Sequence, residues 1–211
     1  MVPDELPAVF LFASLVLAAT PGPGVAYIIA RTLASGRRAG FASVAGVALG
    51  NFGNAVGASL GLAALFAVSS YAFTAVRLAG AAYLFWLGIG ALRASSAPQP
   101  GSLPPAPVAT RVFRDGFLVA LLNPKTALFF AAFLPQFLVP AAPALVQTLR
   151  LGGCFVFIAA GTDVLYVLAA GAAARALAGR ARASAWARRA GGLVLIGLGV
   201  AAAFSSSRPA R

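Results

Sequence analysis

The sequence predicts an all-helical integral membrane protein with six transmembrane helices, arranged as two inverted three-helix repeats. Composition is the first reason, because 61% of the 211 residues are hydrophobic and only 9% are charged, whereas soluble domains have about 25% charged residues. The second reason is a pair of helix-breaking signals inside apolar sequence. The third is the placement of the arginines between the apolar runs. Together these observations exclude an ordinary soluble domain.

Six apolar runs are interpreted as membrane spans. A helix needs about 20 residues to cross about 30 Å of hydrocarbon, and the first five runs reach that length. The first run is interpreted as a retained span and not as a cleaved signal peptide, because Asp4 and Glu5 precede it and no Lys or Arg does. The six predicted spans cover residues 6–30, 40–66, 73–92, 115–138, 145–173 and 190–205.

Residues 94–112 are rich in Pro, Ser and Gly, which is unfavourable for a helix and predicts a flexible linker. This linker divides one membrane domain into a first three-span repeat, residues 1–93, and a second, residues 113–211.

Basic residues alternate between the predicted loops. Loops two and four, at about 67–72 and 139–144, contain none. Short loops rich in Lys and Arg stay in the cytoplasm, so the linker and the odd-numbered loops are predicted to be cytoplasmic and both termini to lie outside. The arginines of the odd-numbered loops are Arg31, Arg37, Arg38, Arg93, Arg111, Arg114, Arg175, Arg180, Arg182, Arg188 and Arg189.

One motif occurs in both halves at the same spacing. Arg77, Gly80, Leu84 and Gly88 in span three correspond to Arg188, Gly191, Leu195 and Gly199 in span six. With three spans per half, the second copy enters from the opposite face, which is the inverted repeat of many secondary transporters. Alternatively, glycines at this spacing only pack helices together. The glycine-rich faces of spans two, three and six could also pair with a second copy, giving a homodimer.

Each half also contains a predicted broken helix, at Pro21–Pro23 and at Pro124. Backbone groups that a break leaves unpaired cost several kcal/mol in hydrocarbon unless protein or water satisfies them, so such breaks usually line a cavity. Paired breaks in corresponding positions point to a transport site. The alternative is a proline kink that only shapes packing.

The first break would free the amides of Gly24, Val25 and Ala26, and a helix N-terminus attracts anions such as a carboxylate. Asn123 and Pro124 would supply the corresponding half of the same site. Other polar contacts are expected from Asn51, Asn54, Thr162 and Tyr166, each of which could equally join two helices.

Asp163 is taken as the only carboxylate deep within a predicted span, and such a residue is a functional candidate by default. It is the predicted proton carrier, with a structural ion pair as the alternative. Lys125, the only lysine of the chain, could meet a substrate carboxylate, pair with Asp163 or extend to the cytoplasmic interface. The predicted substrate-binding residues are Pro21, Gly22, Pro23, Gly24, Asn51, Asn54, Asn123, Pro124, Lys125 and Tyr166.

Several function classes are excluded by what the sequence lacks. There is no histidine and one cysteine, Cys154, so an intrachain disulfide and a His/Cys metal site are ruled out. No nucleophile elbow or phosphate-binding loop is present, which argues against an enzyme, a cofactor and ATP-driven transport. The net charge of +12 does not indicate nucleic-acid binding, because the basic residues do not form one stripe.

Six motifs are found at Thr20–Pro23, Gly46–Gly50, Leu78–Leu84 with Leu87 and Gly88, Phe113–Phe117, Leu122–Phe130 and Phe133–Phe137. Through these motifs the chain strongly resembles the LysE/RhtB family of bacterial amino-acid exporters over almost its whole length. It implies a multi-pass protein of the bacterial inner membrane that expels amino acids, by exchange with protons. Relatives often carry acidic or histidine side chains where this chain has Asn51 and Asn54.

With Asp163 the only acidic candidate at the site, a neutral amino acid or a close derivative is favoured over a dibasic one. The alternatives are a passive small-solute channel and a membrane accessory protein that transports nothing.

Overall fold

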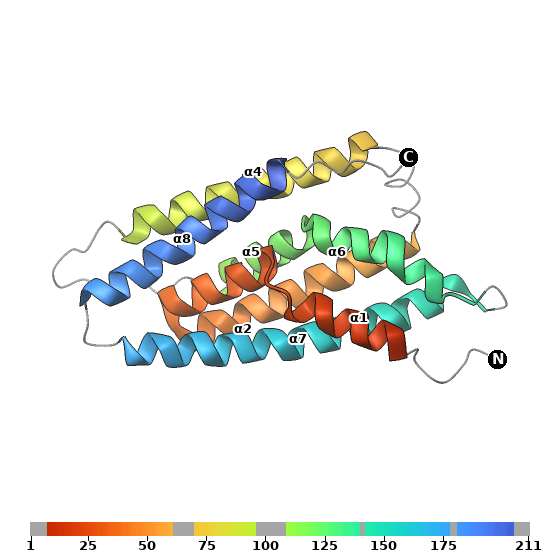
Figure 1. The fold of residues 1–211 in the computed structure, drawn as a ribbon, viewed down its shortest axis with the longest axis horizontal. Coiled ribbons are helices and arrows are strands. Elements are labelled where there is room, and N and C mark those ends of the chain that lie inside the picture. Colours follow the sequence, from red (N-terminus) through yellow and green to blue (C-terminus); the bar gives the residue numbers. More distant parts are fainter. Residues whose placement is uncertain (1–7, 61–69, 96–108, 140–141, 178–180, 205–211) are drawn as a thin grey trace.

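The computed structural model describes residues 8–60, 70–95, 109–139, 142–177 and 181–204, and over these ranges the regular structure is helical throughout (Figure 1). The all-helical prediction is therefore confirmed. The elements are α1 (Ala8–Ala19), α2 (Pro23–Ser59), α4 (Ser70–Ser95), α5 (Ala109–Leu121), α6 (Pro124–Leu128), the π-helix η1 (Phe129–Phe133), the 3-10 helix η2 (Leu134–Phe137), α7 (Ala144–Ala176) and α8 (Ala181–Phe204).

Among the described residues, four helices contain stretches long and apolar enough to cross a membrane, namely those in α2, α4, α7 and α8. A fifth candidate is the pair Ala109–Leu121 and Pro124–Phe137, which is bent by 47°. Helix α1 is apolar but shorter. The chain is therefore a multi-pass membrane protein.

Gly36 divides α2 into two arms, residues 23–35 and 37–59. Its φ of 81° is non-helical and suits glycine, which has no Cβ to clash. The arms fold back on each other and pack closely. A Cβ added at Gly40 would collide with the Thr32 hydroxyl, and one added at Gly24 would lie 3.3 Å from Val47. The predicted spans leave a loop at residues 31–39, but the structure is helical up to the glycine on both sides.

Both predicted breaks are present. Helix α1 ends at Ala19 and α2 begins at Pro23, while α5 ends at Leu121 and α6 begins at Pro124. In each case proline is the first helical residue, where its missing N–H costs nothing because that donor would be unpaired anyway.

The second arm of α2 packs against α5 with almost no side chain between the two backbones. A Cβ added at Gly46 would collide with the Phe113 carbonyl, and one added at Gly50 with the Phe117 carbonyl. From the other side, a Cβ at Gly116 would lie 2.9 Å from the Ser43 carbonyl oxygen. Glycine is needed at this interface because any larger residue would push the helices apart.

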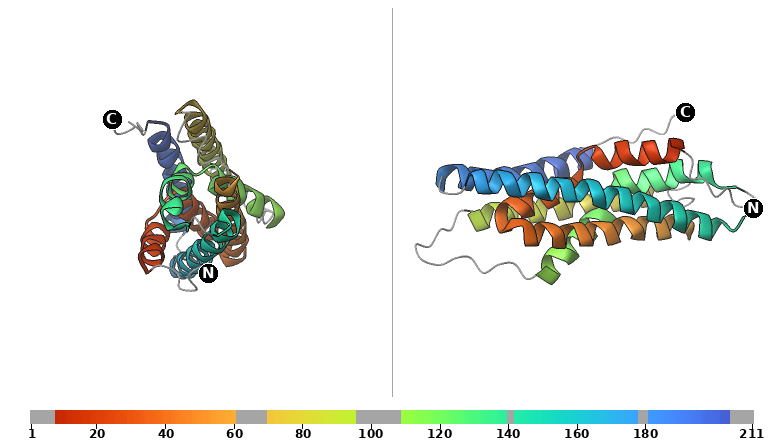
Figure 2. Two further views of the ribbon diagram at one scale, coloured as in Figure 1. Left: turned by 90° about the vertical axis from the view of Figure 1, so that its right-hand side faces the viewer. Right: turned by 90° about the horizontal axis from the view of Figure 1, so that it is seen from below.

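Helices α4 and α8, which carry the repeated motif, lie side by side (Figures 1 and 2). Leu84 and Leu195, at equivalent motif positions, belong to one buried cluster. Gly88 and Gly199 lie at the contact, since Cβ atoms there would meet the carbonyls of Gly192 and Ala81 at 2.7 and 2.8 Å. The glycines at these positions of spans three and six, whose faces could have paired with a second copy of the protein, thus pack against each other's helix within one chain.

The helix ends that are rich in arginine gather at one end of the bundle, at the left of Figure 1. They are the Gly36 turn, which Arg37 and Arg38 follow, the last turns of α4 and α7, which contain Arg93 and Arg175, and the start of α8. We call this the arginine-rich end. Helices α1 and α7 begin at the opposite end.

Several predicted boundaries differ from the structure, and two helices begin more than three residues before the predicted start of their span. Helix α5 begins at Ala109, so the last residues assigned to the linker are helical, and α8 begins at Ala181, within the predicted fifth loop. Linker residues 96–108, residues 67–69 of the second loop, and Asp4 and Glu5 lie outside the described residues, whereas residues 70–72 of that loop are the start of α4.

We expect Gly46→Ala to lower the free energy of unfolding by about 1–3 kcal/mol, because the new methyl group has no space beside the Phe113 carbonyl. The same change at Gly153, where an added Cβ meets nothing within 4 Å, is the matched control and should be neutral or slightly stabilising. Thermal unfolding in detergent compares the two, and equal midpoints would contradict the proposed close packing.

Candidate functional site

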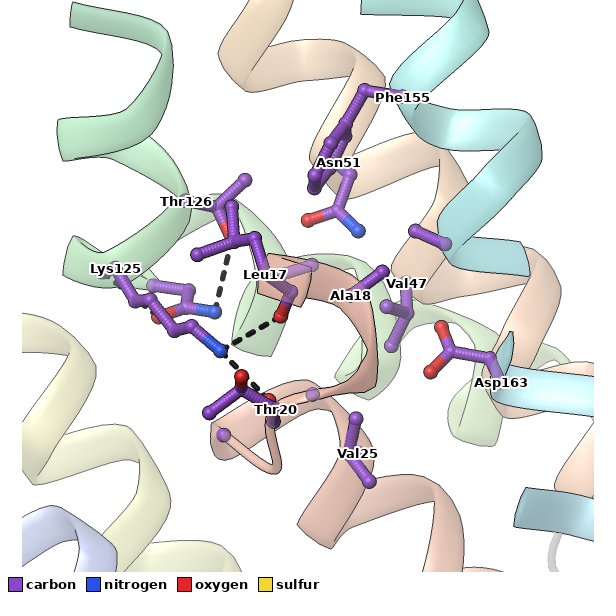
Figure 3. Close-up of a pocket in the computed structure, with 15 residues that line it drawn as sticks. Leu17, Ala18, Thr20, Val25, Val47, Asn51, Lys125, Thr126, Phe155 and Asp163 are labelled. Carbon is purple, nitrogen blue, oxygen red and sulfur yellow. Dashed lines mark hydrogen bonds between the residues drawn. The ribbon is translucent and has the colours of Figure 1, made fainter. Parts of the chain in front are cut away.

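The two helix breaks face one cavity of about 40 Å³. Its walls come from the end of α1, both arms of α2, the end of α5, the start of α6 and the middle of α7 (Figure 3). It is lined by Leu17, Ala18, Thr20, Gly22, Gly24, Val25, Val47, Asn51, Ala120, Asn123, Lys125, Thr126, Phe155, Ala159 and Asp163.

Lys125 connects the two breaks. Its Nζ donates to the carbonyl oxygens of Leu17, at 2.9 Å, and Thr20, at 2.7 Å (Figure 3). The last carbonyls of a helix have no partner within the helix, so a cation from the second half completes the end of α1 in the first half. Of the three roles that the sequence left open for Lys125, pairing with Asp163 is not seen, because Nζ binds these carbonyls.

Tyr166 also caps the end of α1. Its hydroxyl donates to the Ala19 carbonyl oxygen at 2.8 Å, and the residue is not among those that line the cavity. The end of α1 is therefore held by one side chain from α6 and one from α7. Asn54, likewise outside the lining, donates from Nδ2 to the Ala120 carbonyl oxygen at 2.9 Å and so joins α2 to α5.

The two half-helices that follow the breaks differ at their N-termini. Asn123 caps α6, because its Oδ1 accepts the Lys125 backbone N–H at 3.1 Å and its Nδ2 donates to the Thr126 hydroxyl at 3.1 Å. Gly22, the corresponding residue of α2, has no side chain that can act as a cap.

At the start of α2 the first intrahelical bond is donated by Ala26 to the Gly22 carbonyl oxygen, at 2.9 Å. The open donors are therefore the amides of Gly24 and Val25, two and not the three that the sequence suggested. Both residues line the cavity, so this N-terminus can receive an anion there.

Asp163 lies on α7 with only 4% of its surface exposed, and Figure 3 shows it and Lys125 on opposite sides of the end of α1. In the described part of the chain, its carboxylate has no hydrogen bond or ion pair. Asn51, which is 6% exposed, also lines the cavity and has no hydrogen-bond partner among the described residues. Buried polar groups are normally paired, so these two side chains remain available to a ligand.

Six predicted site residues therefore meet at one cavity: Gly22, Gly24, Asn51, Asn123, Lys125 and Asp163. Pro21, Pro23 and Pro124 form the breaks themselves. Sequence reasoning missed Thr126 and the apolar wall of Val47, Phe155 and Ala159, because nothing local distinguishes these residues from others on apolar helices.

A second buried carboxylate was not among the site residues predicted from the sequence. Asp115 of α5 has no exposed surface. Its Oδ2 lies 3.3 Å from Arg31 Nη2, and its Oδ1 accepts a hydrogen bond from the Tyr83 hydroxyl at 3.1 Å and lies 3.6 Å from Arg114 Nη2. Asp115 is the first residue of the predicted fourth span and follows Arg114 of the third loop, and nothing local in the sequence marks it as buried.

The volume of the cavity limits what it can hold in this structure. A site needs about 10–15 Å³ of such space for each water molecule, so 40 Å³ has room for a few waters but not for an amino acid. The helices around the cavity must separate before a solute of that size can enter. Within the described residues no three His, Cys, Asp or Glu side chains group as a metal site.

The comparisons with known proteins agree on one family. The sequence model of the family described as LysE type translocator matches residues 15–206. The homoserine/homoserine lactone efflux protein of Salmonella typhimurium is 38% identical over 143 residues, which cover 68% of this chain and 69% of that protein. The leucine efflux protein of Klebsiella pneumoniae is 31% identical over 130 residues, 61% of each chain. No solved structure matches.

We expect Lys125→Met to lower the free energy of unfolding by about 2 kcal/mol, because hydrogen bonds to a charged group contribute about 1.5–3 kcal/mol and the carbonyls of Leu17 and Thr20 lose their donor. Tyr166→Phe removes one neutral hydrogen bond at the same helix end and should cost about 1 kcal/mol. Thermal unfolding in detergent ranks the two variants, and a Lys125→Met midpoint equal to that of the parent would refute the capping role.

Proposed function

The chain belongs to the LysE type translocator family, and from this premise we propose that it exports a neutral amino acid, or a close derivative, in exchange for protons. Members of this family are transporters and not enzymes. The observation that carries the proposal is the cavity between two broken helices, which combines an open helix N-terminus with an unpartnered buried carboxylate.

The carboxylate of the substrate would bind at the start of α2. The amides of Gly24 and Val25 are open there, and the positive end of the helix dipole favours an anion. Lys125 adds a cation nearby, since its Nζ lies 3.8 Å from the position that a Cβ on Gly22 would occupy.

The ammonium group of the substrate would bind at Asp163, which is the only carboxylate that lines the cavity among the described residues. One acidic group matches one ammonium group. A dibasic substrate would bring a second positive charge without a partner, which is costly in a low-dielectric site.

The substrate side chain would lie against the apolar wall formed by Val47, Phe155 and Ala159. Such a wall suits an aliphatic side chain or a short one with a single hydroxyl. The relatives named as homoserine/homoserine lactone and leucine efflux proteins fit this range, and we extend it to this chain.

Exchange follows if a proton and the substrate ammonium compete for Asp163. The carboxylate would release its proton on the cytoplasmic side, bind the ammonium, and release the substrate outside when a new proton arrives. Because no side chain of the described structure neutralises Asp163, an empty and deprotonated cavity would hold an unpaired buried charge, which is strongly unfavourable. This cost would suppress the conformational change between the outward-facing and inward-facing states when the cavity holds neither substrate nor proton.

The proposed topology has six spans in two inverted repeats. It takes α1 with the first arm of α2 as one broken span, the second arm as the next, and the bent pair of α5 with α6–η2 as the fourth. We place the arginine-rich end in the cytoplasm of a bacterial cell and both termini outside.

We expect cells that contain the protein to lose a preloaded neutral amino acid faster than cells without it. A panel of radiolabelled substrates including homoserine, leucine and lysine measures this, and collapse of the proton gradient should stop the difference. Loss that persists after collapse would indicate a passive channel, and no accelerated loss of any substrate would favour a non-transporting accessory protein.

Asp163→Asn should lower the rate of gradient-driven efflux at least about tenfold, because the amide cannot bind a proton. The protein should stay folded, because the amide has nearly the same shape as the carboxyl group. The matched control is Thr162→Val on the same helix. The Thr162 hydroxyl donates to the Ala159 carbonyl oxygen within α7, and Thr162 is not among the residues that line the cavity. Efflux from proteoliposomes measures both variants, and full coupled activity of Asp163→Asn would remove Asp163 from the mechanism.

A further inference from the structure

A network of buried and partly buried polar groups lies between the cavity and the arginine-rich end. Asp115 of α5 is at its centre, and it contacts Arg31 from the first arm of α2 and Tyr83 from α4. Tyr27, which has no exposed surface, donates to the Val112 carbonyl oxygen at 2.9 Å and accepts from Arg31 Nε at 3.2 Å. The network therefore joins the first half of the chain, through α2 and α4, to the second half, through α5.

Its position follows from helix geometry. On the first arm of α2, Gly24 lines the cavity and Arg31 is seven residues further toward the Gly36 turn, which is about 10 Å along a helix. On α5, Ala120 lines the cavity and Asp115 is five residues before it, about 7–8 Å away. Both measures place the network one to two helical turns beyond the cavity.

The network is not explained by stability alone. Replacement of a buried ion pair by apolar residues is often neutral or stabilising, because desolvation of the charges offsets their attraction. The chain has four acidic residues in all, and one of them is fully buried, where it contacts Arg31, Tyr83 and Arg114. The contacts among these groups are between side chains, which can separate and form again without a change in the backbone.

We propose that the Asp115–Arg31–Tyr83 network is the inner gate of the transport cavity: formed, it closes the path from the arginine-rich end, and it must separate before substrate can enter. These residues position the helices and do not touch substrate. The inference rests on the proposed function for its biological meaning, but the gate itself is tested without a substrate.

The test measures access to the cavity from each face of the membrane. In a Cys154→Ala background, Ala159→Cys places one thiol on the cavity wall. A charged maleimide that does not cross membranes is applied to vesicles of both orientations, and the labelling rate of this thiol is compared between parent and gate variants.

We expect Asp115→Asn to raise the labelling rate from the arginine-rich face by about tenfold, the ratio that corresponds to about 1.4 kcal/mol, with no increase from the other face. The matched control is Arg114→Gln. The Arg114 side chain is 62% exposed, and its Nη2 lies 3.6 Å from the same carboxylate. It should change the rate by less than about twofold, because exposed ion pairs contribute little.

A second variant covers the possibility that Asp115→Asn does not fold. Arg31→Gln combined with Asp115→Asn leaves no unpaired charge and should also show faster labelling from the arginine-rich face, whereas Asp115→Glu should stay close to the parent rate. Unchanged labelling in folded gate variants, or an increase from the opposite face only, would overturn the proposal. If the gate variants show faster labelling but the protein exports no amino acid, the proposed function fails while the gate stands.

Discussion

The structure depends on the requirement that backbone polar groups inside a membrane find partners. A helix that stops in hydrocarbon leaves carbonyls with no donor, and each costs several kcal/mol if it stays unpaired. At the end of α1 the donors are the ammonium of Lys125 and the hydroxyl of Tyr166, both from the second half of the chain. The break in one half is therefore stable only when the other half is docked beside it, and the position of the cavity is fixed by that docking.

The two breaks satisfy this requirement differently. In the second half Asn123 caps α6 with its own side chain, and the residue that follows sends its ammonium across to α1. In the first half glycine leaves the start of α2 uncapped. The two breaks therefore have different roles. The second supports the end of α1 through Lys125, and the first leaves the amides at the start of α2 open to the cavity. The difference is one side chain, Asn123 in place of Gly22.

Local signals allowed much of this fold to be predicted. Proline and glycine inside apolar sequence identified both breaks, and the spacing of the arginines identified helix ends that gather on one side. The helical hairpin at Gly36 was missed, because the arginines around it suggested a longer loop. The partners of Lys125 could not be predicted, since the carbonyls of Leu17 and Thr20 are distant in sequence. The burial of Asp115 could not be predicted for the same reason, as only its tertiary contacts with Arg31 and Tyr83 reveal it.

The glycine contacts between α5 and the second arm of α2 restrict how the protein can move. Helices in direct backbone contact at Gly46, Gly50 and Gly116 have no side-chain layer to slide on, so they behave as one rigid scaffold. A change of shape that opens the cavity must then be carried by the remaining helices, which are α1 with the first arm of α2, the paired α4 and α8, α6 with η1 and η2, and α7. The stationary frame of this bundle is therefore composed of one helix from each half, and each half also supplies moving parts.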